Sequence, residues 1–117
     1  MRLLVFGAHP DDPESGCGGL AARCVQAGHE VVFLYATAFR EGREFFGRPE
    51  KEVRTGEALA ACDVLGVRGI LLDYPHEGVD VNRENIARVT EKIAGENPDI
   101  VVAHWPVDTH PDHRTSA

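Results

Sequence analysis

The stretch GAHPDDPESGCGG, residues 7–19, puts a histidine and two aspartates directly behind an apolar run. A second segment, HPDH at residues 110–113, repeats the same residue types far along the chain. Imidazole nitrogen and carboxylate oxygen are ligands that suit Zn²⁺, and a catalytic zinc takes three protein ligands and keeps one position open for water. The two segments can supply these ligands as His9, Asp12 and His113.

The other polar side chains of the two segments have the chemistry of an amide hydrolase. Zinc lowers the pKa of a bound water from near 16 to about 7. Asp11 can then take the water proton as general base. A protonated His110 can stabilise the oxyanion that forms at an amide carbonyl, and Asp112 can hold His110 in its cationic form.

Each residue also has an ordinary structural explanation. Asp12 precedes Pro13 and, taken alone, is best explained as a helix N-cap. His-Pro pairs are common in turns, and the glycines of residues 16–19 can simply allow close packing of a helix on a strand. Their spacing is not the G-x-G-x-x-G of a dinucleotide-binding fingerprint. Two such segments in one chain nevertheless favour a metal site.

Four apolar runs and three helical stretches must position these residues. The runs, residues 2–8, 30–37, 69–74 and 99–105, are continuous rather than alternating, which is typical of strands buried on both faces. The first helix is predicted from the spacing of Cys17, Leu20, Cys24 and Ala27, with a stop at Gly28; the second over residues 49–66; the third from Ile86, Val89 and Ile93, with a cap at Asn82 or Asn85 and an end at Gly95 and Pro98.

This alternating order predicts an α/β fold with three layers and a mainly parallel sheet. Ligands of such sheets bind outside the carboxyl ends of the strands. HPDD, residues 38–48, residues 75–78 and HPDH each follow one strand, so we expect them along one edge. The segment 38–48 is predicted to be an irregular functional loop, with Arg40 and Glu41 as candidate substrate contacts.

The composition limits the classes of function. A chain of 117 residues that is 43 % hydrophobic suits one folded domain, and a net charge of −7 argues against nucleic acid or an anionic membrane as the main partner. No apolar run has the length of a membrane span, and the first residues become charged too early for a signal peptide. The three cysteines form no C-x-x-C pair, which favours a cytoplasmic protein in which they lie in the core.

AHPDD at 8–12, GCGG at 16–19, VRTGEALAACDVLGV at 53–67 and HPDH at 110–113 together resemble the LmbE-like, or PIG-L-type, family of zinc-dependent N-acetylglucosaminyl deacetylases. The resemblance covers essentially the whole chain. It implies a Rossmann-like fold, a Zn²⁺ cofactor with Fe²⁺ as the alternative, and a small N-acetylated sugar conjugate as substrate. The residue roles that it implies are metal binding by His9, Asp12 and His113, general base catalysis by Asp11, transition-state stabilisation by His110 beside Asp112, and sugar contact by Arg54.

The sequence departs from the family pattern in three places. Glu14 follows HPDD only after Pro13, where many members have Glu directly, and Asp108 stands where some have an oxyanion-binding tyrosine. Residues 75–78 read PHEG where members often have Pro-Asp-Gly, so His76 either touches substrate or is an exposed loop residue. Members usually continue past HPDH, and we expect residues 1–117 to be the N-terminal part of a longer domain. Homo-oligomer formation is left open.

Two hypotheses for the function follow. The first is a metal-dependent hydrolase that removes acetyl from an N-acetylglucosamine-type compound, releasing acetate and a free amine. The second is a metal-holding, Rossmann-like binding module without turnover, which the missing tyrosine favours. A nucleotide-binding domain is disfavoured because the glycine fingerprint is missing.

Overall fold

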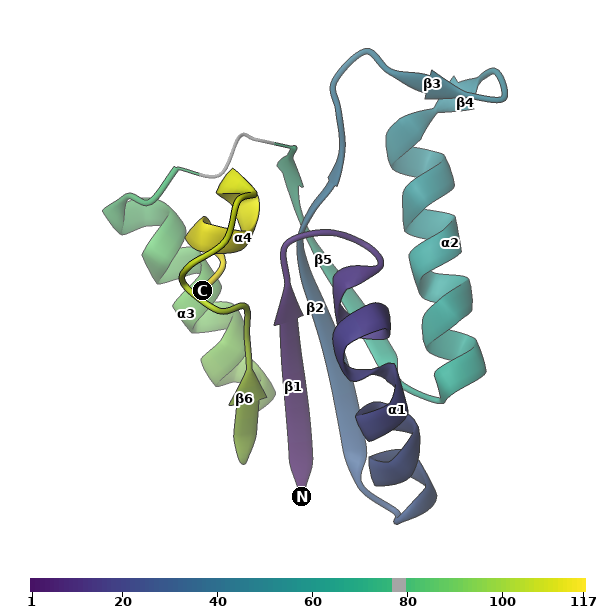
Figure 1. The fold of residues 1–117 in the computed structure, drawn as a ribbon, viewed down its shortest axis with the longest axis vertical. Coiled ribbons are helices and arrows are strands. Elements are labelled where there is room, and N and C mark those ends of the chain that lie inside the picture. The colour runs from purple at the N-terminus through teal and green to yellow at the C-terminus, as the bar shows by residue number, and fades with distance from the viewer. Residues whose placement is uncertain (77–79) are drawn as a thin grey trace.

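A four-stranded sheet between helices forms the body of the protein, in agreement with the predicted α/β architecture (Figure 1). The computed structural model describes residues 1–76 and 80–117. Its elements are β1 (Arg2–Gly7), α1 (Asp12–Gln26), β2 (Glu30–Phe39), β3 (Glu44–Phe45), β4 (Arg48–Pro49), α2 (Glu50–Leu65), β5 (Arg68–Pro75), α3 (Arg83–Glu96), β6 (Ile100–Val102) and α4 (Pro111–Thr115). The predicted order of four long strands or runs and three helices is confirmed; β3, β4 and α4 are additional.

The strands of the main sheet are all parallel, in the order β5-β2-β1-β6. The chain steps outward from β1 to β2 and β5 and then returns to place β6 on the free side of β1. The strand order therefore reverses at β1. Parallel sheets bind ligands beyond the carboxyl ends of the strands at such a reversal, which here means the segments that follow β1 and β6.

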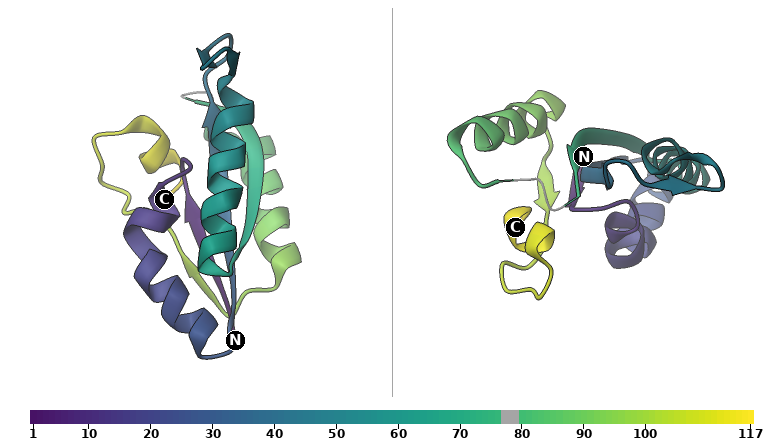
Figure 2. Two further views of the ribbon diagram at one scale, coloured as in Figure 1. Left: turned by 90° about the vertical axis from the view of Figure 1, so that its right-hand side faces the viewer. Right: turned by 90° about the horizontal axis from the view of Figure 1, so that it is seen from above.

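Side chains of the two central strands alternate between buried clusters on the two faces of the sheet. One cluster joins these strands to α1 and α2, through Ala21, Cys24, Ala58 and Cys62. The other lies under α3, which contributes Val89 and Ile93. The view from above in Figure 2 shows α3 on one side of the sheet and the other two long helices on the opposite side. Burial on both faces is thus confirmed for β1 and β2.

The edge strand β6 is less buried and shorter than its apolar sequence predicts. Ile100 and Val101 are 44 % and 46 % exposed, so the prediction of burial on both faces is wrong here. The strand ends at Val102 rather than at residue 105, because it pairs with β1 alone over three residues. Beyond it, His104 leaves the strand direction and its Nε2 accepts a hydrogen bond from the Ala8 amide at 3.0 Å.

Two helices use a slightly different face from the predicted one. On α1 the buried stripe contains Ala21, whereas Leu20 is 50 % exposed; on α3, Ile86 is 53 % exposed. Spacings of three and four residues both lie near one helix face, and the smaller Ala21 allows the closer approach to the sheet. The predicted N-cap is confirmed: the Asn82 side chain accepts a hydrogen bond from the Asn85 amide.

The segment 38–48 is more regular than predicted. β2 continues to Phe39, and β3 and β4 pair as a two-stranded antiparallel hairpin. Phe46 and Gly47 both have positive φ angles at its turn, which is the conformation of tight two-residue hairpins. The hairpin projects beyond the carboxyl edge of the sheet, next to the start of α2 (Figure 1).

Among the described residues, close packing of a helix on a strand depends on Gly7 and on Gly69, and not on the glycines of residues 16–19. A Cβ on Gly7 would meet Cδ of Pro13 at 2.6 Å and Cβ of Asp12 at 3.0 Å, whereas a Cβ on Gly16, Gly18 or Gly19 meets nothing within 4 Å. The tight turn from β1 into α1 therefore depends on Gly7. The interpretation of the later glycines as packing residues is wrong.

We expect Gly7→Ala to lower the free energy of unfolding by about 1 to 3 kcal/mol, because the rigid Pro13 ring cannot move aside without shifting α1. Gly18→Ala is the matched control: it adds the same methyl group in open space inside a helix and should be neutral or stabilising by up to about 1 kcal/mol. Urea unfolding measures both. Equal stability of the two variants would contradict the close approach.

Within the part of the chain that the structure describes, no helix has the length and apolar character needed to cross a membrane.

Candidate metal site

The two segments that carry the metal-binding residue types meet at the carboxyl edge of the sheet. HPDD connects β1 to α1, and HPDH lies at the start of α4, which folds back over the ends of the strands (Figure 1). The rings of His9 and His113 lie 5.2 Å apart between their centroids, although 104 positions separate the two residues in sequence. Residues after β1 and β6, including Asp12, His104 and His113, line a common hollow.

His9, Asp12 and His113 each place a ligand atom within 4.8 Å of the others, which brings the three predicted metal ligands into one group. Asp12 lies between the rings: its Oδ2 is 3.4 Å from His9 Nδ1, and its Oδ1 is 3.4 Å from His113 Nε2. Ligand atoms of a tetrahedral zinc lie about 3.3 to 3.4 Å apart, given bonds of about 2.0 to 2.1 Å. The donor types and these two spacings therefore fit a zinc-like ion.

Each histidine of this group has its second ring nitrogen held by another carboxylate. His9 Nε2 lies 2.9 Å from Asp112 Oδ2, and His113 Nδ1 lies 3.2 Å from Asp108 Oδ2. A carboxylate accepts and does not donate, so both rings carry a proton on these nitrogens. The other nitrogen of each ring faces Asp12 and can bind a metal once it holds no proton. Such carboxylate–histidine pairs fix the ring and the tautomer of metal-binding histidines.

Asp112 contacts other histidines of the site besides its neighbour His110. Its buried carboxylate contacts His9 and, at 3.3 Å, His76 Nδ1. The His110 ring is engaged by the Asp112 backbone instead: the amide donates to His110 Nδ1 at 3.2 Å. His110 Nδ1 thus accepts a hydrogen bond from the backbone, and the role of the Asp112 side chain in holding a cationic His110 stays a prediction.

Asp12 is not the N-cap of α1, contrary to its simplest explanation. The N-cap is Asp11, with a φ of 109°. Asp12 turns inward, and its carboxylate accepts a hydrogen bond from the His9 amide at 2.7 Å. Asp11 remains exposed, and its amide donates to the Glu14 carboxylate at 3.2 Å. Few residues with a side chain adopt a left-handed φ, although Asp is among the more tolerant, and such backbone strain concentrates at functional sites.

The electrostatics of the group favour an ionised Asp12. Burial would raise the pKa of Asp12, but hydrogen bonds from His9 and the charges of His113 and His104 lower it to about 2. Burial would likewise lower the pKa of His9, yet hydrogen bonds to Asp12 and Asp112 outweigh it and raise the pKa. A metal must displace a proton that binds His9, so metal affinity should fall as the pH falls.

Three residues of the site were not assigned to it from the sequence. His104 stacks on His113 with ring centroids 4.2 Å apart, and its Nε2 lies 3.2 Å from Asp12 Oδ2. Asp108 holds His113, and the His76 ring meets His9 edge-on at 4.2 Å. All three could have been predicted from their position in the sequence, because each follows a strand at the edge of the sheet where the predicted ligands lie.

Asp108→Asn should weaken metal binding about 10- to 100-fold, the usual cost of removing a carboxylate that supports a ligand histidine. The amide keeps the shape but no longer accepts the His113 Nδ1 proton as a charged group. Competition with a chromophoric chelator measures the affinity. Asp63→Asn, an exposed acid on α2, is the control, and equal affinities of the two variants would remove Asp108 from the site.

The three residues that are predicted to contact the substrate lie around this group and differ in how far they are buried. Arg54, half-buried on α2, donates from Nη2 to the Pro10 carbonyl at 3.0 Å and so lies against the HPDD loop. The backbone amide of Arg40 donates to the buried Glu50 carboxylate at 2.9 Å. The Nη2 of the Arg40 side chain lies 3.4 Å from His76 Nε2. Glu41 is exposed in the hollow that Arg40 and Glu50 also line.

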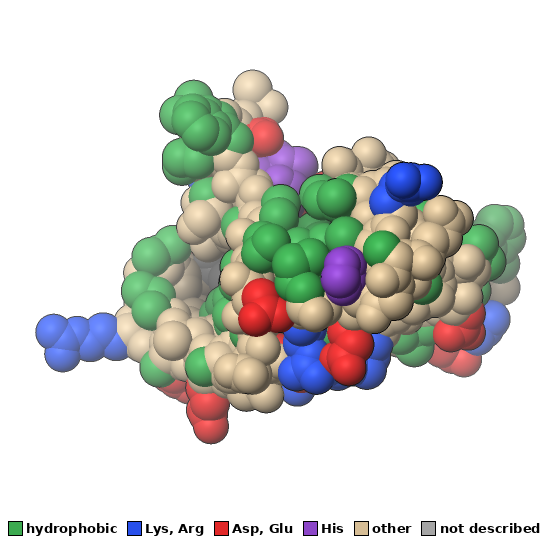
Figure 3. All heavy atoms as spheres, turned by 90° about the horizontal axis from the view of Figure 1, so that it is seen from below, with side chains coloured by type: hydrophobic (Ala, Val, Ile, Leu, Met, Phe, Trp, Pro, Cys, Tyr) green, Lys and Arg blue, Asp and Glu red, His purple; other side chains and the backbone are tan. Residues whose placement is uncertain are grey.

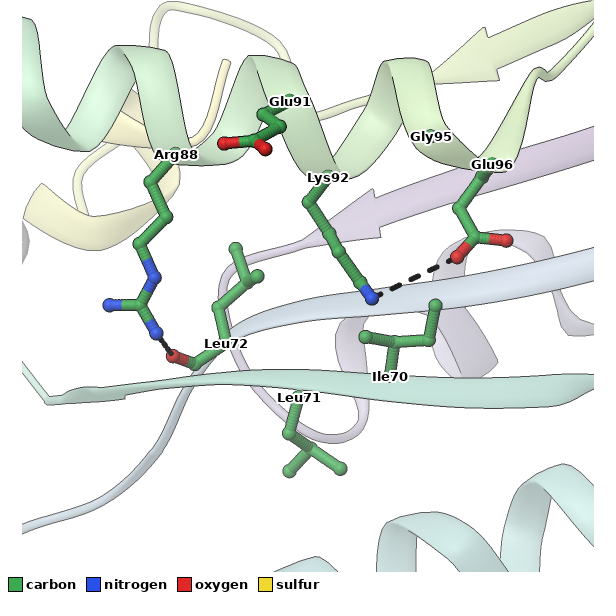
Figure 4. A pocket seen from close by; sticks show the side chains of 8 residues that line it. All are labelled: Ile70, Leu71, Leu72, Arg88, Glu91, Lys92, Gly95 and Glu96. Carbon is green, nitrogen blue, oxygen red and sulfur yellow. Dashed lines mark hydrogen bonds and ion pairs between the residues drawn. The ribbon is translucent and has the colours of Figure 1, made fainter.

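Two other surfaces of the described residues have a different chemistry. In the hollow between α3 and β5, Arg88 donates to the Leu72 carbonyl at 2.6 Å, and Lys92 lies 3.9 Å from Glu96 on the same helix, so both cations already have partners within the chain (Figure 4). At the amino ends of the strands, acidic and basic side chains lie side by side and histidine covers little of the surface (Figure 3). One such contact joins Arg2 Nε to Glu30 at 2.7 Å.

Residues 4–117 match the protein family described as PIG-L, GlcNAc-PI de-N-acetylase. Diacetylchitobiose deacetylase of Thermococcus kodakarensis is 32 % identical over 120 residues, covering 97 % of this chain and 45 % of that protein. The 1D-myo-inositol 2-acetamido-2-deoxy-alpha-D-glucopyranoside deacetylase of Kineococcus radiotolerans is 30 % identical over 151 residues, covering 96 % and 41 %.

The fold is similar to that of a solved deacetylase. N,N'-diacetylchitobiose deacetylase from Pyrococcus horikoshii, complexed with its inhibitor MPG, superposes with a TM-score of 0.86 at 28 % identity, covering 98 % of this chain and 46 % of that one. The chain therefore spans less than half the length of these relatives.

Proposed function

The chain belongs to the PIG-L family, and from this premise we propose that it is a metal-dependent N-deacetylase. Its substrate is an N-acetylglucosamine-type sugar conjugate, whose amide is hydrolysed to acetate and a free amine. The observation that carries the proposal is the group of His9, Asp12 and His113 at the reversal of strand order, next to the exposed carboxylate of Asp11. The names of the two relatives, both deacetylases of N-acetylated sugars, support the substrate class.

His9 Nδ1, the Asp12 carboxylate and His113 Nε2 would hold the metal. Zn²⁺ suits this set of ligands, and Fe²⁺ is the alternative because it binds the same donor types. When bound, the ion supplies Lewis acidity to the hydrolysis. Asp112 and Asp108 orient the two histidines from behind.

Asp11 acts as the general base in this proposal. Its neighbour Asp12 faces the metal position, and the turn at φ 109° holds Asp11 out toward solvent on the same loop. Glu14 supports that turn, since its carboxylate accepts from the Asp11 amide and, at 2.6 Å, from the buried Tyr35 hydroxyl. Asp11 takes a proton from the attacking water, whose oxygen forms the new bond to the acetyl carbon.

His110 supplies a hydrogen-bond donor. Its Nδ1 accepts from the Asp112 amide, so its Nε2–H is available to stabilise the developing charge on the acetyl oxygen. As the carbon–nitrogen bond breaks, the nitrogen takes the proton that Asp11 accepted from the water and leaves as the amine. The acetyl group leaves as acetate. Arg54, Arg40 and Glu41 contact the sugar in this proposal.

The test is an amine-release assay on the protein loaded with Zn²⁺ or Fe²⁺. N,N'-diacetylchitobiose and N-acetylglucosaminyl-inositol are the substrates to use, with metal-stripped protein as the blank. Metal-dependent release of one amine per acetate supports the deacetylase. Stoichiometric metal with no release from either conjugate would favour the binding module without turnover.

The three free cysteines support a reducing compartment, for which we propose the cytoplasm. Cys24 and Cys62 are buried and Cys17 is half-buried, in agreement with the predicted core positions. Unpaired cysteines in a folded core are typical of proteins kept in a reducing environment.

A further inference from the structure

A buried tyrosine of the core reaches the turn that carries Asp11. Tyr35 lies on β2 and is 0 % exposed, in the cluster between the sheet and the helices α1 and α2. Its hydroxyl donates to Oε1 of Glu14 at 2.6 Å, and Oε2 of the same carboxylate accepts from the Asp11 amide at 3.2 Å. Glu14 therefore connects the core of the protein to the backbone of the proposed general base.

The hydrogen bonds of this connection have fixed donors and acceptors. Burial, together with the contacts to Cys62 and Glu14, raises the pKa of Tyr35, so the hydroxyl keeps its proton. It donates that proton to the Glu14 carboxylate, which can only accept. The Cys62 thiol, whose Sγ lies 3.3 Å from the hydroxyl, then donates to the Tyr35 oxygen. The three side chains form one continuous link from α2 through β2 to α1.

Glu14 has the position in α1 from which a side chain can reach the Asp11 amide. Asp11 is the N-cap, so Glu14 is the third residue of the helix. An acidic side chain at that position accepts from the N-cap amide in a capping box. Pro13 holds the second position, where the family pattern has Glu. The departure from that pattern thus places an acid where it can bind the turn and the core at once.

The Asp11 turn needs such support. Its φ of 109° is strained for a residue with a side chain, and its side chain is exposed. Without an acceptor behind it, the amide can turn to solvent and φ can relax, which moves the Asp11 carboxylate. Asp12 is fixed separately, because its carboxylate accepts from the His9 amide at 2.7 Å. A relaxed turn would therefore displace the base and leave the metal ligand in place.

We propose that Tyr35 and Glu14 are positioning residues, which hold the Asp11 turn in the conformation that presents its carboxylate to the attacking water. Neither residue touches the substrate. The effect on catalysis rests on the proposed function, whereas the hold on the turn does not. A displaced base costs rate and not binding, so loss of the link should lower kcat and leave KM and metal content unchanged.

Tyr35→Phe tests the proposal by steady-state amine release, with Tyr74→Phe as the matched control. Tyr35→Phe deletes the hydroxyl that holds Glu14 and should lower kcat about 10-fold at unchanged KM and metal content. The Tyr74 hydroxyl on β5 is buried and has no hydrogen-bond partner among the described residues. Tyr74→Phe should therefore leave kcat unchanged. An unchanged kcat in Tyr35→Phe, or an equal fall in both variants, would overturn the proposal.

Glu14→Gln distinguishes positioning from packing. Gln has the shape of Glu, but its NH₂ group faces one of the two donors that the carboxylate serves, so kcat should fall here as well. In the Asp11→Asn background, neither Tyr35→Phe nor Glu14→Gln should lower release further, because the base that they position is gone. Losses that multiply in that background would contradict a role through Asp11.

Exchange of the Asp11 amide proton with solvent, measured by NMR, tests the link without any turnover. It should be several-fold faster in Tyr35→Phe and in Glu14→Gln than in wild type and in Tyr74→Phe. Equal exchange in all four proteins would show that the link does not hold the turn. If the wild-type protein releases no amine, the proposed function fails, and this comparison still decides whether Tyr35 and Glu14 hold Asp11.

Discussion

Asparagine in place of Asp11 is expected to lower the rate of amine release about 10²- to 10⁴-fold, the contribution of a positioned general base. The metal content should not change, because the ligands of the proposed site are other side chains. Asn has the shape of Asp and tolerates a left-handed backbone, so the turn at φ 109° should persist. What the variant lacks is a carboxylate that accepts the proton of the attacking water. Steady-state release and metal analysis on the same sample measure the two effects.

Asp63→Asn is the control for Asp11→Asn, since it makes the same chemical change at an exposed position on α2. It should leave both quantities at the wild-type level. If Asp11→Asn released amine at more than about a tenth of the wild-type rate, Asp11 would not be the base, because a base supplies at least about 10²-fold. Loss of metal in that variant would instead show that Asp11 supports the HPDD loop and not the chemistry.

The sequence predicts the inner part of the fold better than its edges. β1 and β2 have continuous apolar runs because they have neighbours on both sides and helices on both faces. β6 has the same kind of sequence but pairs with β1 alone, and Ile100 and Val101 remain exposed. Periodicity does not reveal how many neighbours a strand has. It also cannot detect β3, β4 and α4, which are two to five residues long.

One topological rule is enough to predict where the site lies. It does not predict which side chains of the site contact each other. Segments that follow parallel strands meet at one edge, which is enough to bring His9, Asp12 and His113 together. Adjacency in sequence suggested that Asp112 serves His110, and the two residues do belong to one group of side chains. The contacts of the Asp112 carboxylate with His9 and His76 could not be predicted in the same way. Contacts between loops depend on side-chain directions that spacing does not encode.

The reversal of strand order also explains why four histidines gather at one place. His9 follows β1, His76 follows β5, and His110 and His113 belong to α4 beyond β6. His9 lies at the centre, with the rings of the other three at 4.2 to 5.2 Å from its own. So many histidine rings in one place need hydrogen-bond acceptors. Three carboxylates, those of Asp12, Asp108 and Asp112, lie among the rings. The carboxylates thus fix the orientations of rings that gather around a single buried histidine.

His113→Ala is expected to weaken metal binding about 10²- to 10³-fold and to abolish amine release at ordinary metal concentrations. Zinc sites with four protein ligands have binding free energies of about 10 to 16 kcal/mol, so one ligand accounts for about 3 kcal/mol. His113 also separates Asp12 from Asp108, to which it is joined at 3.4 and 3.2 Å. Its removal leaves two carboxylates facing a gap, which disfavours the arrangement further. Dialysis against a chelator followed by metal analysis measures the loss.

The control for His113→Ala is Asp108→Asn, which keeps the ligand and changes only its support. The affinity order wild type, Asp108→Asn, His113→Ala should therefore hold, with release following metal content in each. Excess Zn²⁺ should restore part of the release in Asp108→Asn, because the three ligands remain. It should not restore release in His113→Ala, where one of the three ligands is missing. Full metal content in His113→Ala at low free Zn²⁺ would remove His113 from the ligand set.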